Sequence, residues 1–213
     1  MSKTKSIDLL EPILARAFGL TRTFDAPPLL TSLWENTVVL KENEVALLEE
    51  VRKKLVKHAD SWNEEELKMQ FISMVIFLAQ FNEPISIYYE RDISETIQGK
   101  LVKSTVDMLL SKGLGELIET PYFFLHEYKR EKKYSGDPVG QMLGGMLIGQ
   151  AKNANEKPVY GCYVQGRYWY FSVLTEKTYC ISSGFDATDE TKCKQIVGIL
   201  RKVRDIILTE LMD

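Results

Sequence analysis

The chain has 213 residues, of which 45% are hydrophobic and 27% are charged, and its formal net charge is −3 from 27 basic and 30 acidic residues. This is the composition of a globular protein long enough to bury a core without disulfides or structural metals. The slight acidic balance gives no bulk sign of a nucleic-acid binder, so any phosphate-binding function has to come from a local cluster of side chains.

The cysteines and histidines exclude several kinds of site. Cys162, Cys180 and Cys193 are odd in number and lack CxxC spacing, so reduced thiols in the cytoplasm are expected rather than a disulfide framework. His58 and His126 are far apart and sit in no recognisable motif, which argues against a zinc site and against a histidine-based catalytic triad. Metal-assisted or carboxylate chemistry remains open.

Neither export nor membrane insertion is expected. Charged residues and a proline interrupt the first twenty residues, unlike a signal peptide. The longest apolar run, 71–81, is about half a bilayer span. We therefore expect a soluble, cytoplasmic protein with no membrane partner.

The first third of the chain is predicted to be helical. Apolar residues recur at helical spacing over 7–18, and Asn43 is a candidate N-cap for a second helix that runs to Val56. Asn63 is a good N-cap for a third helix, because three glutamates follow it and suit the positive end of a helix. This third helix continues to Ala79.

From Ile85 the pattern alternates between strands and helices, which predicts helices packed on a sheet. Strands are predicted over 85–89, 101–110, 122–129, 159–165, 168–174 and 178–182. Helices are predicted over 138–150, with Asp137 as N-cap, and over 188–212. Gly140, Gly144 and Gly145 share one side of the first of these helices, and we expect them to let it approach the sheet closely.

An acid and a lysine end the most aromatic strand. Strand side chains alternate between faces, so Glu127 and Lys129 point the same way and Tyr128 points the opposite way. The same ExK spacing also occurs at 66–68, 131–133 and 190–192, in helical or strongly charged stretches where solvated side chains are expected. Charge at the mouth of a buried strand is costly unless it is paired or bound to metal, which sets Glu127 and Lys129 apart.

Asp107 supplies a second carboxylate, because it lies among apolar residues of the strand predicted over 101–110. If this strand pairs with 122–129 as a hairpin, Asp107 and Glu127 converge. Two carboxylates form a hard-oxygen site for Mg²⁺ or Mn²⁺. A metal there would bind a scissile phosphate and lower the pKa of a bound water. Lys129 would position that water or stabilise the charge that develops in the transition state.

These residues, with the loop between them and the helix after them, follow in the order of a known family. The segment 62–174 resembles the metal-binding core of the PD-(D/E)xK nuclease superfamily, in an uncharacterised bacterial branch. Two residues depart from the family pattern: Val106 stands where a proline is usual, and Tyr128 stands where a smaller residue is usual. The motif is short, so the order of the elements carries the resemblance.

The resemblance implies both a fold and a site. The fold would be α/β (α+β), with a restriction-endonuclease-like core in which helices flank a central mixed β-sheet. Residues 61–213 would form this nuclease-like domain, and 1–60 would form a helical N-terminal extension packed on it. Asp107 and Glu127 would bind the metal and Lys129 would assist catalysis. Gln141 and an acid of the leading helix, for which Glu66 is preferred over Glu64 and Glu65, would support the site.

The expected partner is nucleic acid, DNA in preference to RNA, with a homodimer or a partner subunit left open. Arg130, Lys132 and Lys133 follow the motif and are candidate phosphate contacts, although such a run equally suits a solvated loop. Two other hypotheses stay open: a nuclease fold that has lost catalysis and only binds nucleic acid or protein, and an unrelated α+β protein that binds proteins or small ligands.

Overall fold

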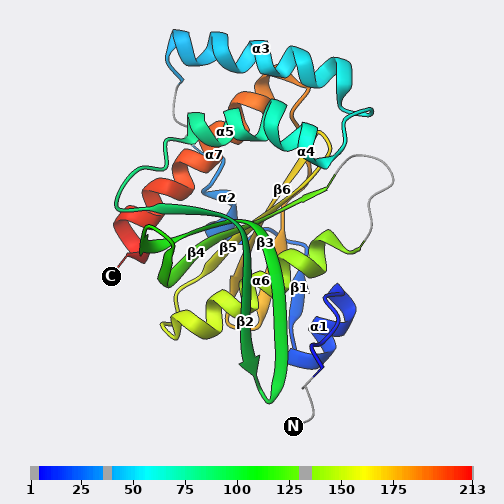
Figure 1. Ribbon diagram of the computed structural model, residues 1–213, viewed down its shortest axis with the longest axis vertical. Coiled ribbons are helices and arrows are strands. Elements are labelled where there is room, and N and C mark those ends of the chain that lie inside the picture. The colour runs from blue at the N-terminus through cyan, green and yellow to red at the C-terminus, as the bar shows by residue number, and fades with distance from the viewer. Residues whose placement is uncertain (1–4, 36–39, 130–135, 213) are drawn as a thin grey trace.

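One mixed β-sheet forms the centre of the computed structural model, which describes residues 5–35, 40–129 and 136–212 (Figure 1). The strand order is β1-β7-β6-β5-β4-β3-β2, with β8 paired to β6. The strands are β1 (Thr21–Thr23), β2 (Ser86–Ile97), β3 (Lys100–Leu114), β4 (Leu117–Lys129), β5 (Val159–Gln165), β6 (Tyr168–Thr175), β7 (Thr178–Ile181) and β8 (Phe185–Asp186). The pairs β4–β5 and β1–β7 are parallel and the other pairs are antiparallel.

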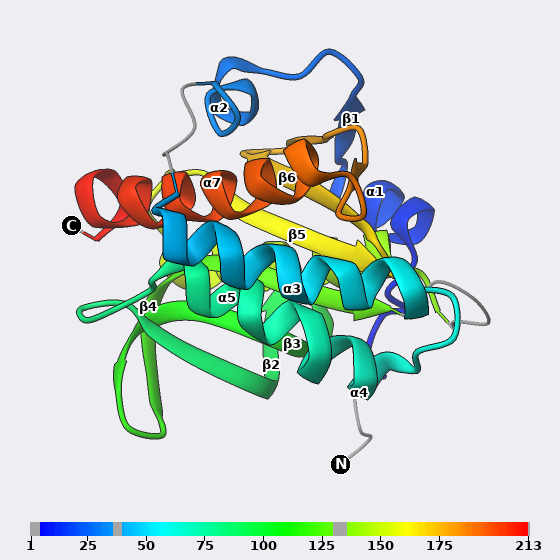
Figure 2. The same cartoon turned by 90° about the horizontal axis from the view of Figure 1, so that it is seen from above.

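Helices cover both faces of this sheet. They are α1 (Glu11–Phe18), α2 (Pro28–Thr31), α3 (Glu42–His58), α4 (Glu64–Leu67), α5 (Ser73–Ala79), α6 (Pro138–Asn153) and α7 (Glu190–Ile206), with π-helical turns η1 (Lys68–Ile72) and η2 (Ile207–Leu211). One buried cluster joins α3, α5 and α7 to the sheet, and a second joins α1 and α6 to it. Figures 1 and 2 show α3, α5 and α7 grouped on one side. The prediction of a mixed sheet flanked by helices is confirmed.

Several local predictions are confirmed in detail. Asp137 caps α6, since its carboxylate accepts a hydrogen bond from the backbone N–H of Val139 at 3.0 Å. Asn63 caps α4 and accepts a hydrogen bond from the backbone N–H of Glu66 at 2.9 Å. The β5–β6 pair forms the hairpin expected around Gly166.

Two predictions for the first sixty residues need correction. The N-cap of α3 is Lys41 rather than Asn43. The segment is also not wholly helical, because β1 adds an edge strand beside β7, with Thr21 opposite Thr178. This strand has only three residues, Thr-Arg-Thr, and so lacks the apolar alternation by which a strand is recognised in sequence.

Two of the three glycines expected to approach the sheet, Gly140 and Gly144, have the N-terminal segment as their neighbour instead. A Cβ on Gly140 would lie 2.3 Å from the carbonyl oxygen of Leu9 and 2.8 Å from the backbone nitrogen of Glu11. The glycine therefore lets the N-terminal segment, rather than the sheet, approach the helix. On the sheet side the close approach is made by Gly161 of β5, where a Cβ would lie 2.6 Å from the Sδ of Met146.

None of the helices in the described part of the chain combines the length and apolarity needed to cross a bilayer.

Candidate functional site

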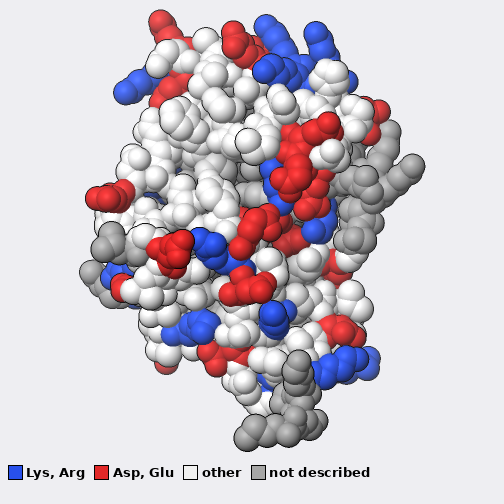
Figure 3. Space-filling model, viewed as in Figure 1, with Lys and Arg blue, Asp and Glu red and all other residues white. Residues whose placement is uncertain are grey.

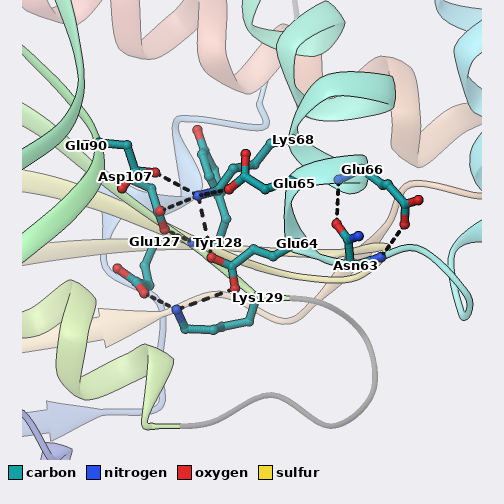
Figure 4. Close-up of polar contacts among 10 residues, drawn as sticks. All are labelled: Asn63, Glu64, Glu65, Glu66, Lys68, Glu90, Asp107, Glu127, Tyr128 and Lys129. Atoms are coloured by element: carbon teal, nitrogen blue, oxygen red, sulfur yellow. Dashed lines mark hydrogen bonds and ion pairs between the residues drawn. The ribbon is translucent and has the colours of Figure 1, made fainter.

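Asp107 and Glu127 lie on adjacent antiparallel strands, as the hairpin hypothesis required. Met108 of β3 is opposite His126 of β4, so Asp107 and Glu127 are the next residues along their strands. Beyond this pair, a side-chain hydrogen bond links the two strands. Asp107 Oδ2 accepts a hydrogen bond from the backbone N–H of Tyr128 at 2.6 Å. The Asp107 carboxylate is thus fixed to the backbone in the middle of the ExK motif (Figure 4).

Glu127 and Lys129 form an ion pair at the end of β4. Lys129 Nζ lies 2.7 Å from Glu127 Oε1, and both side chains are largely buried. Glu127 is in register with Tyr163 of β5, whose side chain belongs to the cluster on the α6 side of the sheet. Tyr128 belongs to the opposite cluster, as strand alternation predicts.

Burial and neighbouring negative charges raise the pKa of both acids. Burial, and after it the negative charge of Asp107, raises the pKa of Glu127 to about 7, against the opposing effect of Lys129. Burial also raises the pKa of Asp107, although the hydrogen bonds from Lys68 and from Tyr128 N–H work against this. Both carboxylates are therefore buried enough for an added cation to stabilise their charged forms.

Lys68 is a central residue of the site that the sequence did not reveal. Its Nζ lies 2.7 Å from Asp107 Oδ1 and 2.8 Å from Glu90 Oε1. Burial alone would lower the pKa of Lys68, but the hydrogen bonds to Asp107 and Glu90 outweigh burial and raise it. Lys68 was expected to be a solvated helix residue, because its ExK pair falls in a charged helix. The available signal was Glu64, four residues earlier on the same helix face.

Two acids of the leading helix contact Lys68, namely Glu64 and the more exposed Glu65, and of these Glu64 also reaches Lys129. Its two carboxylate oxygens lie 3.5 Å from Lys68 Nζ and 3.8 Å from Lys129 Nζ, so it links both lysines. Glu66, the preferred candidate, instead accepts a hydrogen bond from the backbone N–H of Asn63 at 2.8 Å and completes the capping box. Figure 4 shows this carboxylate turned away from Asp107 and Glu127.

Gln141 is a further candidate that the described contacts do not join to this network. Among the described residues its side-chain oxygen, which is buried, has no hydrogen-bond partner, and a Cβ on Gly136 would lie 3.2 Å from it. Within the described ranges no hydrogen bond connects Gln141 to Asp107, Glu127 or Lys129. Arg130, Lys132 and Lys133 lie outside the described residues.

The donor set suits Mg²⁺ in chemistry but is engaged by lysines. Of the side chains that the structure describes, no three His, Cys, Asp or Glu are gathered so as to hold a metal. Asp107 and Glu127 do supply the two carboxylates that Mg²⁺ commonly takes from a protein while it keeps several waters. Because Lys68 contacts Asp107 and Lys129 contacts Glu127, a metal would have to compete with these two ammonium groups.

Acidic residues surround this site on the surface. Figure 3 shows Asp and Glu side chains gathered from the region of α4 across β2 and β3. Among them are Glu65 and Glu90, with side chains 76% and 59% exposed. The described face is thus not a basic surface of the kind that attracts phosphate backbones.

No protein-family model matches the chain, and a search of curated proteins found no significant match.

Proposed function

We propose that the protein is a metal-dependent nuclease with a restriction-endonuclease-like core, which hydrolyses phosphodiester bonds of nucleic acid in the cytoplasm. The observation that carries this proposal is the grouping of Asp107, Glu127 and Lys129 at the end of one strand pair, with Glu64 reaching them from the leading helix. Burying that much charge on two interior strands of the sheet is unfavourable for a purely structural purpose.

Each residue has a role in this proposal. Asp107 and Glu127 would hold Mg²⁺ or Mn²⁺, and the metal would supply Lewis-acid polarisation of the phosphate and a more acidic water. Lys129 would act as a hydrogen-bond donor rather than as a base. Burial alone would lower the pKa of Lys129, but the hydrogen bond to Glu127 outweighs burial and raises it. Its ammonium would orient the attacking water or stabilise the charge on the phosphate. Glu64 would position Lys129.

The acidic surroundings bear on the substrate. With acidic residues exposed near the site (Figure 3), we expect nucleic acid to bind weakly unless divalent ions are present, and binding to weaken further as salt rises. DNA is the preferred substrate in this proposal. A homodimer or a partner subunit would supply the basic surface that the described face lacks.

Cleavage assays test the proposal directly. Purified protein is incubated with single- and double-stranded DNA and with RNA in Mg²⁺ or Mn²⁺, and the products are resolved on gels. Glu127→Gln and Lys129→Met should each reduce cleavage about 100-fold or more, since each removes a charge from the reacting centre. Glu119→Gln on the same strand and Lys103→Met on β3 are matched controls that should cleave normally. Absence of cleavage by wild-type protein, or full activity of both site variants, would refute the nuclease.

A second candidate is a nuclease fold that binds nucleic acid without cutting it. The observation that favours it is the pairing of Asp107 and Glu127 each with its own lysine, which gives both carboxylates a cationic partner without metal. This candidate predicts nucleic-acid binding that Mn²⁺ leaves unchanged and a melting temperature that Mn²⁺ does not raise. The nuclease predicts that Mn²⁺ increases both.

A further inference from the structure

The ammonium group of Lys68 is surrounded by carboxylates. Besides Asp107 and Glu90, it lies 3.4 Å from Glu65 Oε1 and 3.5 Å from Glu64 Oε1 (Figure 4). Its side chain is only 15% exposed, and the Tyr128 ring centroid lies 6.0 Å from Nζ. Tyr128, the large residue in the ExK motif, therefore forms part of the surface against which Lys68 packs.

The backbone places Lys68 in this position by an uncommon device. The helix that begins at α4 changes to the π-helical turn η1 at Lys68 and returns to α-helix at Ser73. A π-helical turn is costly in backbone geometry and is found frequently at functional sites. Here it occurs at the residue that spans from the helix to β2 and β3.

The oxygen that Lys68 holds is the one that a metal needs. Asp107 Oδ2 is engaged by the backbone N–H of Tyr128, which leaves Oδ1 as the oxygen directed to a ligand, and Lys68 donates to it. An ammonium group and a divalent cation seek the same carboxylate oxygens, and the repulsion between two positive charges at contact distance disfavours holding both at Oδ1.

We propose that Lys68 is a built-in counter-ion that occupies the cation position at Asp107 and must be displaced before a divalent ion binds there. This inference rests on the proposed function, because it concerns the same metal site. Lys68 then sets the divalent-ion concentration at which the site fills, and until that point it offsets part of the negative charge of the carboxylate cluster. Substituting it removes the competitor and leaves the carboxylates uncompensated.

Direct metal binding tests the inference without a substrate. Mn²⁺ affinity is measured by electron paramagnetic resonance, and Mg²⁺ affinity by isothermal titration calorimetry, for wild type, Lys68→Met and Lys68→Arg. Removing one positive charge at contact distance should tighten divalent binding about tenfold or more in Lys68→Met. Lys68→Arg should stay close to wild type. Lys103→Met, which removes an exposed lysine near Asp92 toward the turn of the β2–β3 hairpin, should also leave the affinity unchanged.

A second measurement uses wild-type protein alone, in case Lys68→Met does not fold. Lysines are acetylated with a water-soluble reagent with and without Mg²⁺, and the modified peptides are quantified by mass spectrometry. Lys68 should be protected without metal and become several-fold more reactive as Mg²⁺ displaces it, whereas Lys103 should react equally in both. Unchanged protection of Lys68 at saturating Mg²⁺ would overturn the inference, as would Mn²⁺ affinity in folded Lys68→Met no tighter than in wild type.

The two proposals fail in different ways. If wild-type protein cleaves nucleic acid and Lys68→Met binds Mn²⁺ no more tightly, the nuclease stands and the role of Lys68 falls. If Lys68→Met binds Mn²⁺ more tightly while wild-type protein cleaves nothing at any metal concentration, the counter-ion role stands and the nuclease falls.

Discussion

At the scale of single residues, two glutamates on one helical turn show how position decides which groups a side chain contacts. Glu64 faces the sheet and links Lys68 to Lys129, whereas Glu66, half a turn away, folds back onto the backbone of Asn63. Three consecutive acids look alike in sequence, and the direction of each is set by how the helix is rotated against the sheet.

Paired variants separate these roles. Glu64→Gln should lower metal-dependent cleavage about 10- to 100-fold, because it removes the charge that positions both lysines, and it should leave the fold intact. Glu66→Ala should keep the activity and lose about 0.3–1.5 kcal/mol of stability with its capping hydrogen bond. The measurements are initial cleavage rates and urea unfolding. Equal rates for Glu64→Gln and wild type would show that the leading-helix acid does not serve catalysis.

The residues that sequence identified at the site are those whose placement is local. Strand alternation is enough to put Glu127 and Lys129 on one side, and the apolar context marks Asp107 as an acid that needs a partner. The positions of Lys68 and Glu64 depend instead on how their helix docks against the sheet. The partners of Lys68 in β2 and β3 are 22 and 39 residues away along the chain. Periodicity along one element carries no information about that docking, so Lys68 resembled any solvated helix lysine.

At the scale of elements, α6 is held from two sides by close backbone approaches. The N-terminal segment lies against Gly140 and Gly144, and Glu11 N–H donates to the Asp137 carboxylate at 2.8 Å. The sequence predicted α6 and its cap well, because both signals are local. The predicted neighbour of Gly140 and Gly144 was wrong, because glycines on one side of a helix indicate a close approach but do not identify the approaching segment.

Two alanine substitutions in α6 distinguish a backbone neighbour from a flexible one. Gly140→Ala should destabilise the protein by about 1–3 kcal/mol through overlap with the main chain of Leu9 and Glu11, despite a helix-propensity gain of about 1 kcal/mol. Gly144→Ala receives the same gain but meets only the Leu9 side chain, which can turn aside, so its stability should stay near wild type. Thermal unfolding measures both. Similar stability in the two variants would contradict the tight packing at Gly140.

At the scale of the whole molecule, one buried network joins helices from the two ends of the chain. Glu44 of α3 accepts hydrogen bonds from Arg201 of α7 at 2.7 Å and from the Gln80 side chain at 2.8 Å. Arg201 also donates to the carbonyl oxygen of Leu78 at 2.9 Å. Nothing in the spacing of these residues predicts their meeting, since 157 positions separate the two charges.

This network should make the folded protein less stable toward unfolding as the pH falls into the acid range. The hydrogen bonds from Arg201 and from Lys41 N–H lower the pKa of Glu44, so the unfolded chain binds a proton more readily than the folded one. The stabilisation is complete above the unfolded pKa of about 4.3 and is lost as pH falls through the lower, folded pKa.

Glu44→Gln should lose about 3 kcal/mol at pH 7, because it leaves Arg201 buried without its carboxylate. Its stability should then fall less steeply than that of wild type between about pH 4.5 and pH 3. The measurement is urea unfolding across this range, with exposed Glu42→Gln of the same helix as the control. Parallel pH profiles for Glu44→Gln and wild type would contradict the lowered pKa.

The pairing of β1 with β7 affects how folding can proceed during synthesis on the ribosome. The ribosome releases Thr21 about 157 residues before Thr178, its partner in the sheet, and Glu11 and Glu44 likewise await Asp137 and Arg201. In a nascent chain, the first segment therefore cannot form these contacts until the residues that it pairs with have been synthesised. Contacts of such long range slow folding. Chains stalled before β7 should thus present an unprotected N-terminal segment to proteases, and full-length chains should not.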